Sequence, residues 1–392
     1  MKTFIKRLIT FAVILFISIY VINSETDWLK SFDSNFPEIA EKYPEAASAA
    51  KDLSELLSRI PSISQLAAHI TNEEMPLSPE EFADNAYIKN SPLLNFYDRE
   101  CVGISVNDDN TVSVFGVSRE MGNSNIIVRM VNGEEVLGET YFAADTEFKF
   151  SKKIDIPETS ADKISVEVYS GERRFGNYDG WVNAYAYILN QDGKWIMYRS
   201  PVAEKNSELY AQKRAKTLKA TPSVQSDSAS TKSVAEQLTA DAGSDYEKLL
   251  KIHDWICTYV HYDYDSLASG EIAPYVSTEV LKTQKAVCLG YANLYAALCR
   301  SINIPCSVVT GYALGISSGS TWWNDENVNG SEENHAWNEA YVDGRWVIID
   351  ATWDTYNSFE NGKMKKGNHI SHLYFDANID FFSNNHRIMK YN

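Results

Sequence analysis

The segment NHAWNEAYVDGRWVIIDATWD, residues 334–354, constrains the fold most because it predicts a β-hairpin whose register can be counted. Asp343-Gly344 is a preferred dipeptide for a two-residue type I′ loop between alternating strands. If Val342 pairs with Arg345, counting outward places Trp337 opposite Asp350 and His335 opposite Thr352. His335 and Asp350 are then diagonal neighbours on one face of the hairpin.

A carboxylate at that diagonal position can hold an imidazole ring in one tautomer and stabilise its charged form. Asp354 has the same parity and would oppose Glu333, so counting alone does not exclude it. We prefer Asp350 because it ends the continuous apolar run Trp346–Ile349, where position along the strand is better defined. A lone histidine on a strand is usually structural, and the carboxylate partner is what favours a catalytic interpretation.

Cys288 is the candidate nucleophile. Polar residues give way at this position to a predicted helix that runs to about Arg300, followed by a predicted strand over Cys306–Tyr312. The unpaired amides and the dipole at a helix start favour a thiolate over a thiol. A buried structural cysteine is the alternative, and this segment alone leaves both open. With His335 and Asp350 downstream, the pattern indicates a nucleophile, a base and an orienting carboxylate.

The motifs resemble the core of the transglutaminase-like superfamily, over about residues 233–392. The resemblance is carried by the HDWI helix, by VCLGYANLYAALCRSINIPCSVVTGY, by the hairpin segment and by the closing stretch HLYFDANIDFFSNNHRI. It implies a papain-like α+β fold in which Cys288, His335 and Asp350 occupy the three catalytic positions. One departure concerns the approach to the nucleophile, because many relatives have a Gly-Val-Cys step where this chain has Ala286-Val287-Cys288.

The resemblance implies a thiol enzyme that forms a thioester with a carboxamide or peptide carbonyl and passes the acyl group to an amine or to water. A cysteine peptidase or amidase with the same triad, and a non-catalytic surface-binding protein that retains the fold, are the alternatives. The backbone amide of Cys288 is the candidate oxyanion donor, with Gln284 or Tyr264 as a second. Trp322 and Trp323 either shape an acceptor groove or pack a loop onto the domain.

No cofactor is expected, because no ligand set of a usual spacing is present. His253 and His261 lie eight positions apart with Asp254 nearby, and we interpret them as satisfied histidines of a helix face rather than as metal ligands. Five cysteines are too few for a disulfide scaffold, although a bridge between Cys299 and Cys306 stays open.

The N-terminal segment predicts export. Lys2, Lys6 and Arg7 precede an apolar run over Leu8–Ile22, which is typical of a signal peptide. Residues 1–24 are therefore expected to be a signal peptide or an N-terminal membrane anchor. We expect a secreted or cell-surface protein that acts on extracellular proteins or peptides. A formal net charge of −17 argues against nucleic acid as a partner.

The chain is expected to be multidomain, since 392 residues exceed the usual size of one core. Residues 25–92 predict a helical segment, and period-two alternation over residues 93–200 predicts an all-β, sandwich-like module. Within that module, we interpret the aromatic run Trp181–Ile188 as core packing, with a ligand-binding face as the alternative. Residues 201–232 are predicted to be an exposed linker, and residues 233–392 to be the catalytic domain.

Overall fold

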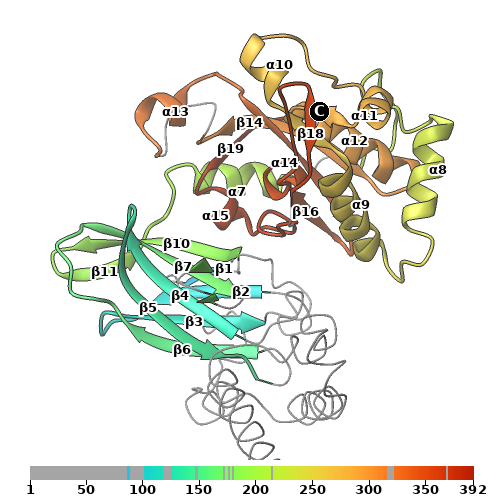
Figure 1. Cartoon of the computed structure of the whole chain (residues 1–392). Coiled ribbons are helices and arrows are strands. Elements are labelled where there is room, and N and C mark those ends of the chain that lie inside the picture. Colours follow the sequence, from blue (N-terminus) through green and yellow to red (C-terminus); the bar gives the residue numbers. More distant parts are fainter. Residues whose placement is uncertain are drawn as a thin grey trace, which may run out of the picture. The chain divides into compact units, whose positions relative to one another are not determined.

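The structure is a computed structural model, shown in Figure 1. It describes residues 86–88, 101–117, 125–145, 149–170, 173–174, 177–178, 181–212, 215–315, 322–367 and 370–392. The predicted signal peptide or anchor, and nearly all of the predicted helical segment 25–92, lie outside these residues. Among the described residues, no helix is both long and apolar enough to cross a membrane.

The upstream region is rich in strands, as the period-two pattern predicts. One sheet has the order β1-β2-β3-β6, and a second has the order β11-β10-β7-β4-β5. The strands of these sheets are β1 (Ala86–Ile88), β2 (Cys101–Val106), β3 (Thr111–Val117), β4 (Asn125–Asn132), β5 (Glu135–Ala143), β6 (Lys149–Asp155), β7 (Lys163–Ser170), β10 (Trp181–Gln191) and β11 (Lys194–Met197). The short strands β8 (Arg173–Arg174) and β9 (Asn177–Tyr178) form a separate pair.

Both sheets contribute to one hydrophobic core, which holds Val112 and Val114 of β3 and Val166 and Val168 of β7. In β10 the small residues Ala184 and Ala186 and the branched Ile188 are buried in this core. The tyrosines that alternate with them point the other way. Tyr185 packs against Phe381, with ring centroids 5.2 Å apart. Tyr185 and Tyr187 therefore do not fill the space between the sheets, which corrects the interpretation as core packing for these two side chains.

Two boundaries predicted from the sequence are wrong. Strand β1 lies within the segment predicted to be helical, because pairing with β2 gives these residues a strand ladder that local propensity does not reveal. The predicted linker contains helix α7 (Ala203–Ala211) and the start of α8 (Ala229–Leu238). Asn206 of α7 is fully buried and donates from Nδ2 to the hydroxyl of Ser383 and the carbonyl of His386. The polar composition of residues 201–232 indicated an exposed linker, because the buried contacts of this segment come from distant parts of the chain.

The C-terminal region combines helices with two sheets. One sheet has the order β16-β15-β14-β19 and the other the order β13-β12-β17-β18. The strands are β12 (His261–Asp263), β13 (Lys285–Ala286), β14 (Cys306–Ala313), β15 (His335–Val342), β16 (Arg345–Ile349), β17 (Ser358–Glu360), β18 (Lys363–Lys365) and β19 (His386–Tyr391). The remaining helices are α9 (Asp245–Tyr259), α10 (Tyr264–Ser269), α11 (Ser277–Thr283), α12 (Cys288–Ser301), α13 (Asp325–Asn329), α14 (Ala351–Asp354) and α15 (Ile379–Phe382).

The sheet β16-β15-β14-β19 is buried on both faces. Ala336 and Ala340 of β15 belong to the core that contains α12, whereas Trp337 belongs to the core that contains Phe381 and Phe382 of α15. Figure 1 shows α12 and α15 on either side of this sheet. Burial on both faces explains why the strands are nearly continuous runs of apolar residues rather than clean alternations.

Candidate active site

Cys288 is the first residue of α12, as predicted. Val287 precedes it in an extended conformation, and no side chain caps the helix start. The first amides of a helix have no intrahelical acceptor, so the N–H groups of Cys288 and Leu289 are available to an anion beside the thiol. The Cys288 side chain is half-buried and the thiol is free.

The start of α12 is held in place by a glycine. A Cβ added to Gly290 would lie 2.6 Å from the carbonyl oxygen of Pro274 and 2.5 Å from the Cβ of Ala286. Two segments thus approach the first turn of the helix more closely than any side chain at this position would allow. Ala286 is in β13, where it pairs with Tyr262 of β12. This small sheet therefore positions the residues immediately before the nucleophile.

His335 and Asp350 meet across the hairpin. The predicted register is confirmed, because Val342 pairs with Arg345 and the ladder continues to Asn338 opposite Ile349. Strand β16 ends there, and Asp350 leaves the ladder to become the N-cap of α14. Nε2 of His335 lies 2.6 Å from Oδ2 of Asp350. The other carboxylate oxygen, Oδ1, accepts from the backbone N–H groups of Thr352 and Trp353, which prevents the carboxylate from rotating away.

Asp354, the alternative partner allowed by strand parity, lies elsewhere. It is in α14, where the helical turn carries it away from the strand face, and its Oδ2 is 3.1 Å from Nε2 of His253. Of the two aspartates, the structure therefore places Asp350 and not Asp354 beside His335.

His386 is a member of the cluster that the sequence did not reveal. Its Nε2 lies 3.2 Å from the same Oδ2 of Asp350, and its ring stacks on Phe382 with centroids 3.9 Å apart. It is fully buried at the start of β19, where it pairs with Ala313 of β14. No local pattern predicts this contact, since it depends on the pairing of two strands far apart in the sequence.

The two histidines have opposite pKa shifts. Burial lowers the pKa of His335, but the charge and hydrogen bond of Asp350, together with a hydrogen bond to Cys288, outweigh it and raise the pKa to about 10. Burial lowers the pKa of His386 to about 4, only partly offset by its bond to Asp350. Burial also raises the pKa of Asp350, but the charge of His335 and the bonds from both histidines bring it below its usual value.

At neutral pH the cluster thus contains a charged His335, a neutral His386 and an ionised Asp350. Asp350 uses Oδ2 to bind Nε2 of His335, which leaves the other ring nitrogen, Nδ1, for the Cys288 thiol. Cys288 lies in α12 and His335 lies in β15. A buried amide helps to fix the distance between this helix and this strand, because Nδ2 of Asn338 in β15 donates to the carbonyl of Ala292 in α12. This arrangement places a thiol nucleophile beside a charged imidazole that can donate a proton.

Tyr262, which pairs with Ala286 just before the nucleophile, is a further candidate for the second oxyanion donor beside Gln284 and Tyr264. Burial raises the pKa of Tyr262, and the nearby charges of Cys288 and Asp350 raise it further. Its phenol therefore stays protonated and can donate. Tyr264 begins α10 and is 37% exposed, whereas Gln284 ends α11 in a left-handed conformation with its backbone carbonyl accepting from His261.

Several other expectations are resolved in this region. Trp323 packs the loop onto the domain, since its indole N–H donates to the carbonyls of Ser383 and Asn384. Trp322 packs edge-on against Tyr187, with ring centroids 4.6 Å apart. Cys299 and Cys306 are both free, buried thiols.

Residues 232–351 match the family model described as the Transglutaminase-like superfamily. The chain therefore carries a transglutaminase-like domain, which confirms the resemblance for this segment. Kyphoscoliosis peptidase from Mus musculus is 34% identical over 120 residues, which are 31% of this chain and 17% of the relative. The Homo sapiens protein of the same name is 33% identical over the same shares of both chains. The chain thus matches only 17% of the length of these curated relatives.

Solved structures provide weaker similarities. A protein from Cytophaga hutchinsonii described as a candidate cysteine protease is 17% identical, with a TM-score of 0.28 over 79% of this chain and 83% of that one. The periplasmic domain of TgpA from Pseudomonas aeruginosa is 12% identical, with a TM-score of 0.25 over 59% of this chain and 88% of that one.

Proposed function

We propose that the chain is a thiol enzyme that uses Cys288 to form a thioester with a carboxamide or peptide carbonyl. The observation that carries this proposal is the 2.6 Å contact between His335 and Asp350 next to a free thiol at the start of a helix. The transglutaminase-like match supports it, because that superfamily includes both transglutaminases and cysteine peptidases. A non-catalytic binding protein has no need for a charged histidine beside a half-buried cysteine.

In the proposed reaction, the Cys288 thiolate attacks the carbonyl carbon and the carbonyl oxygen becomes an oxyanion. The backbone N–H of Cys288 and the hydroxyl of Tyr262 donate hydrogen bonds to this oxygen. The imidazolium of His335 then gives its Nδ1 proton to the nitrogen of the departing amine as the C–N bond breaks. A thioester and a neutral imidazole remain, with Asp350 still bound to Nε2.

The second half of the reaction returns the enzyme to its starting state. An amine or a water molecule attacks the thioester carbonyl while His335 accepts its proton at Nδ1. The C–S bond breaks, the acyl product leaves, and the thiolate and imidazolium pair forms again. Transfer to an amine and hydrolysis differ only in this attacking group, so the same residues serve an acyltransferase, a peptidase or an amidase.

Export is part of the proposal. The basic residues Lys2, Lys6 and Arg7, followed by the apolar run Leu8–Ile22, support a secreted or cell-surface protein that is anchored if the segment is not cleaved. The substrates would then be extracellular or surface proteins and peptides. The net charge of −17 argues against nucleic acid as a substrate.

The proposal can be tested by incubating the purified chain and its Cys288→Ala variant with a mixed peptide library and a labelled primary amine. Incorporation of the amine that depends on Cys288 identifies a transferase, and cleavage without incorporation identifies a hydrolase. Thiol alkylation provides a readout independent of substrate, with a denatured sample as the reference for an ordinary cysteine. If the chain neither transfers nor cleaves, and Cys288 is alkylated no faster than that reference, the enzymatic proposal is wrong.

A further inference from the structure

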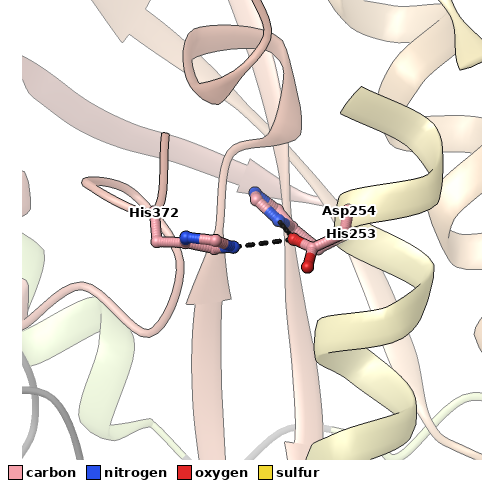
Figure 2. A group of neighbouring side chains, drawn as sticks. All are labelled: His253, Asp254 and His372. Carbon is pink, nitrogen blue, oxygen red and sulfur yellow. Dashed lines mark hydrogen bonds and ion pairs between the residues drawn. The ribbon is translucent and has the colours of Figure 1, made fainter. Parts of the chain in front are cut away.

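A second cluster of histidine and carboxylate side chains shares no residue with the Cys288 site. His253 and Asp254 lie in α9, and His372 lies in the segment that follows β18 (Figure 2). Oδ1 of Asp254 is 2.9 Å from Nδ1 of His253 and 2.7 Å from Nε2 of His372. One donor atom from each residue lies within 4.8 Å of the others. The structure thus adds to the His253 and Asp254 pair a third group that sequence spacing did not reveal.

The second ring nitrogen of His253, Nε2, interacts with another carboxylate, that of Asp354. Nε2 of His253 lies 3.1 Å from Oδ2 of Asp354, and both side chains are fully buried. Asp354 is held in turn by the backbone N–H of Tyr374. In the structure both ring nitrogens of His253 face carboxylate oxygens, so each nitrogen donates an N–H. A bound metal ion would replace the proton on Nδ1, while Nε2 would keep its hydrogen bond to Asp354. This arrangement behind a histidine is typical of metal ligands.

We propose that His253, Asp254 and His372 bind a divalent transition-metal ion of the zinc type. Two imidazoles and one carboxylate are ligands that zinc prefers, and a water molecule would complete a four-coordinate site. Asp254 as a ligand and Asp354 behind His253 together balance the two positive charges of the ion. His261 is not part of this site, because it lies in β12 and belongs to neither histidine and carboxylate cluster found among the described residues.

The donor distances fit this ion after a small adjustment. Zinc binds nitrogen and oxygen at about 2.0–2.2 Å, so ligands at tetrahedral angles lie about 3.4 Å apart. The present separations of 2.7 and 2.9 Å are shorter because the groups now bond to one another. The side chains of Asp254 and His372 are 38% and 27% exposed, whereas that of His253 is fully buried. The two outer ligands can therefore move apart, and the ion can enter from solvent.

The backbone around the site is already fixed. Isolated bridges join Ile370 to Thr355 and Phe375 to Ile349, on either side of His372. The N–H of Ser371 also donates to the carbonyl of Asp354. A metal ion would join α9 to this segment and, through Asp354, to the end of α14. Asp350 caps the other end of that four-residue helix, so the proposed ion would stabilise the frame that holds the orienting carboxylate.

Zinc titration of the full chain tests this proposal. We would use a Cys288→Ala background, because a reactive thiol beside a histidine is itself a zinc ligand, and would measure affinity by competition with a chromophoric chelator. One equivalent of zinc should bind, and Mg²⁺ should not compete, because it prefers oxygen ligands. The variants His372→Ala and Asp254→Asn should each weaken zinc binding by on the order of 100-fold.

The matched control is Asp241→Asn. It removes the same negative charge from an aspartate whose side chain is 80% exposed and which pairs with Lys251 of α9, so it should leave zinc affinity unchanged. Circular dichroism checks that each variant is folded. If His372→Ala does not fold, the comparison of zinc affinities uses Asp254→Asn alone. Equal zinc affinity in the variants and the parent, or no saturable binding by the parent, would overturn the proposal. Visible absorption of bound Co²⁺ that disappears in His372→Ala would support it directly.

Discussion

Replacing Asp350 with asparagine removes one negative charge from the Cys288 site while keeping the shape of the side chain. The N-cap of α14 should survive, because asparagine accepts from backbone N–H groups as well as aspartate does. In the unchanged protein the pKa of His335 is raised from 6.5 to about 10. That difference corresponds to about 5 kcal/mol in favour of the imidazolium.

Burial is already the largest single influence on the pKa of His335 and lowers it, and in the variant the charge of Asp350 no longer opposes it. We therefore expect the pKa of His335 to fall below 6.5 in the Asp350→Asn variant, so that less than about 3% of it is protonated at pH 8. The stability that His335 contributes is fully present below pH 6.5 and is lost as the pH rises through about 10, because the folded protein holds the proton more tightly. The variant should lose this dependence.

The assay is a chemical-shift titration of histidine rings in a selectively labelled chain, from pH 5 to pH 11, with the rate of Cys288 alkylation measured in parallel. In the unchanged protein one ring should titrate near pH 10, and its signal should be absent from a His335→Gln variant. In Asp350→Asn it should titrate below pH 6.5, and alkylation at pH 7 should be slower. Asp241→Asn serves as the exposed-charge control. A His335 ring that still titrates near pH 10 in Asp350→Asn would refute the reasoning.

The other predictions concern the residues around this pair. Tyr262→Phe should reduce turnover by about 10²–10³ while leaving the urea midpoint unchanged, and unaltered turnover would exclude Tyr262 as an oxyanion donor. Gly290→Ala should destabilise the chain by about 1–3 kcal/mol in urea unfolding, since the carbonyl of Pro274 leaves no room for a Cβ; an unchanged midpoint would contradict this. Because the pKa of His386 is lowered to about 4, the unfolded chain binds more protons there, and stability worth about 3 kcal/mol should be lost as the pH falls from 6.5 to 4. His386→Phe, which keeps the ring that stacks on Phe382, should remove this acid-side loss, and an unchanged pH dependence of unfolding would count against it.

Local signals account for much of what the sequence predicts in this protein. The start of α12 at Cys288 follows from a change from polar to helix-forming residues, and the hairpin register follows from Asp343-Gly344 and the period of two. Both depend on interactions between residues close in the chain. For that reason the register as far as Asn338 and Ile349 can be counted from the sequence, which brings His335 and Asp350 to the same end of the hairpin.

The tertiary structure alone decided which further groups join each cluster. His386 reaches Asp350 because β19 pairs with β14, and His372 reaches Asp254, 118 positions away in the chain, because β-bridges fix its segment beside α9. Asp354 has the strand parity that would place it beside His335, yet it binds His253 because the chain leaves β16 at Asp350 and turns into α14. Strand parity predicts which residues share a face only within a strand, and β16 ends at Ile349. Contacts between distant segments have no period in the sequence, since they depend on how whole elements pack.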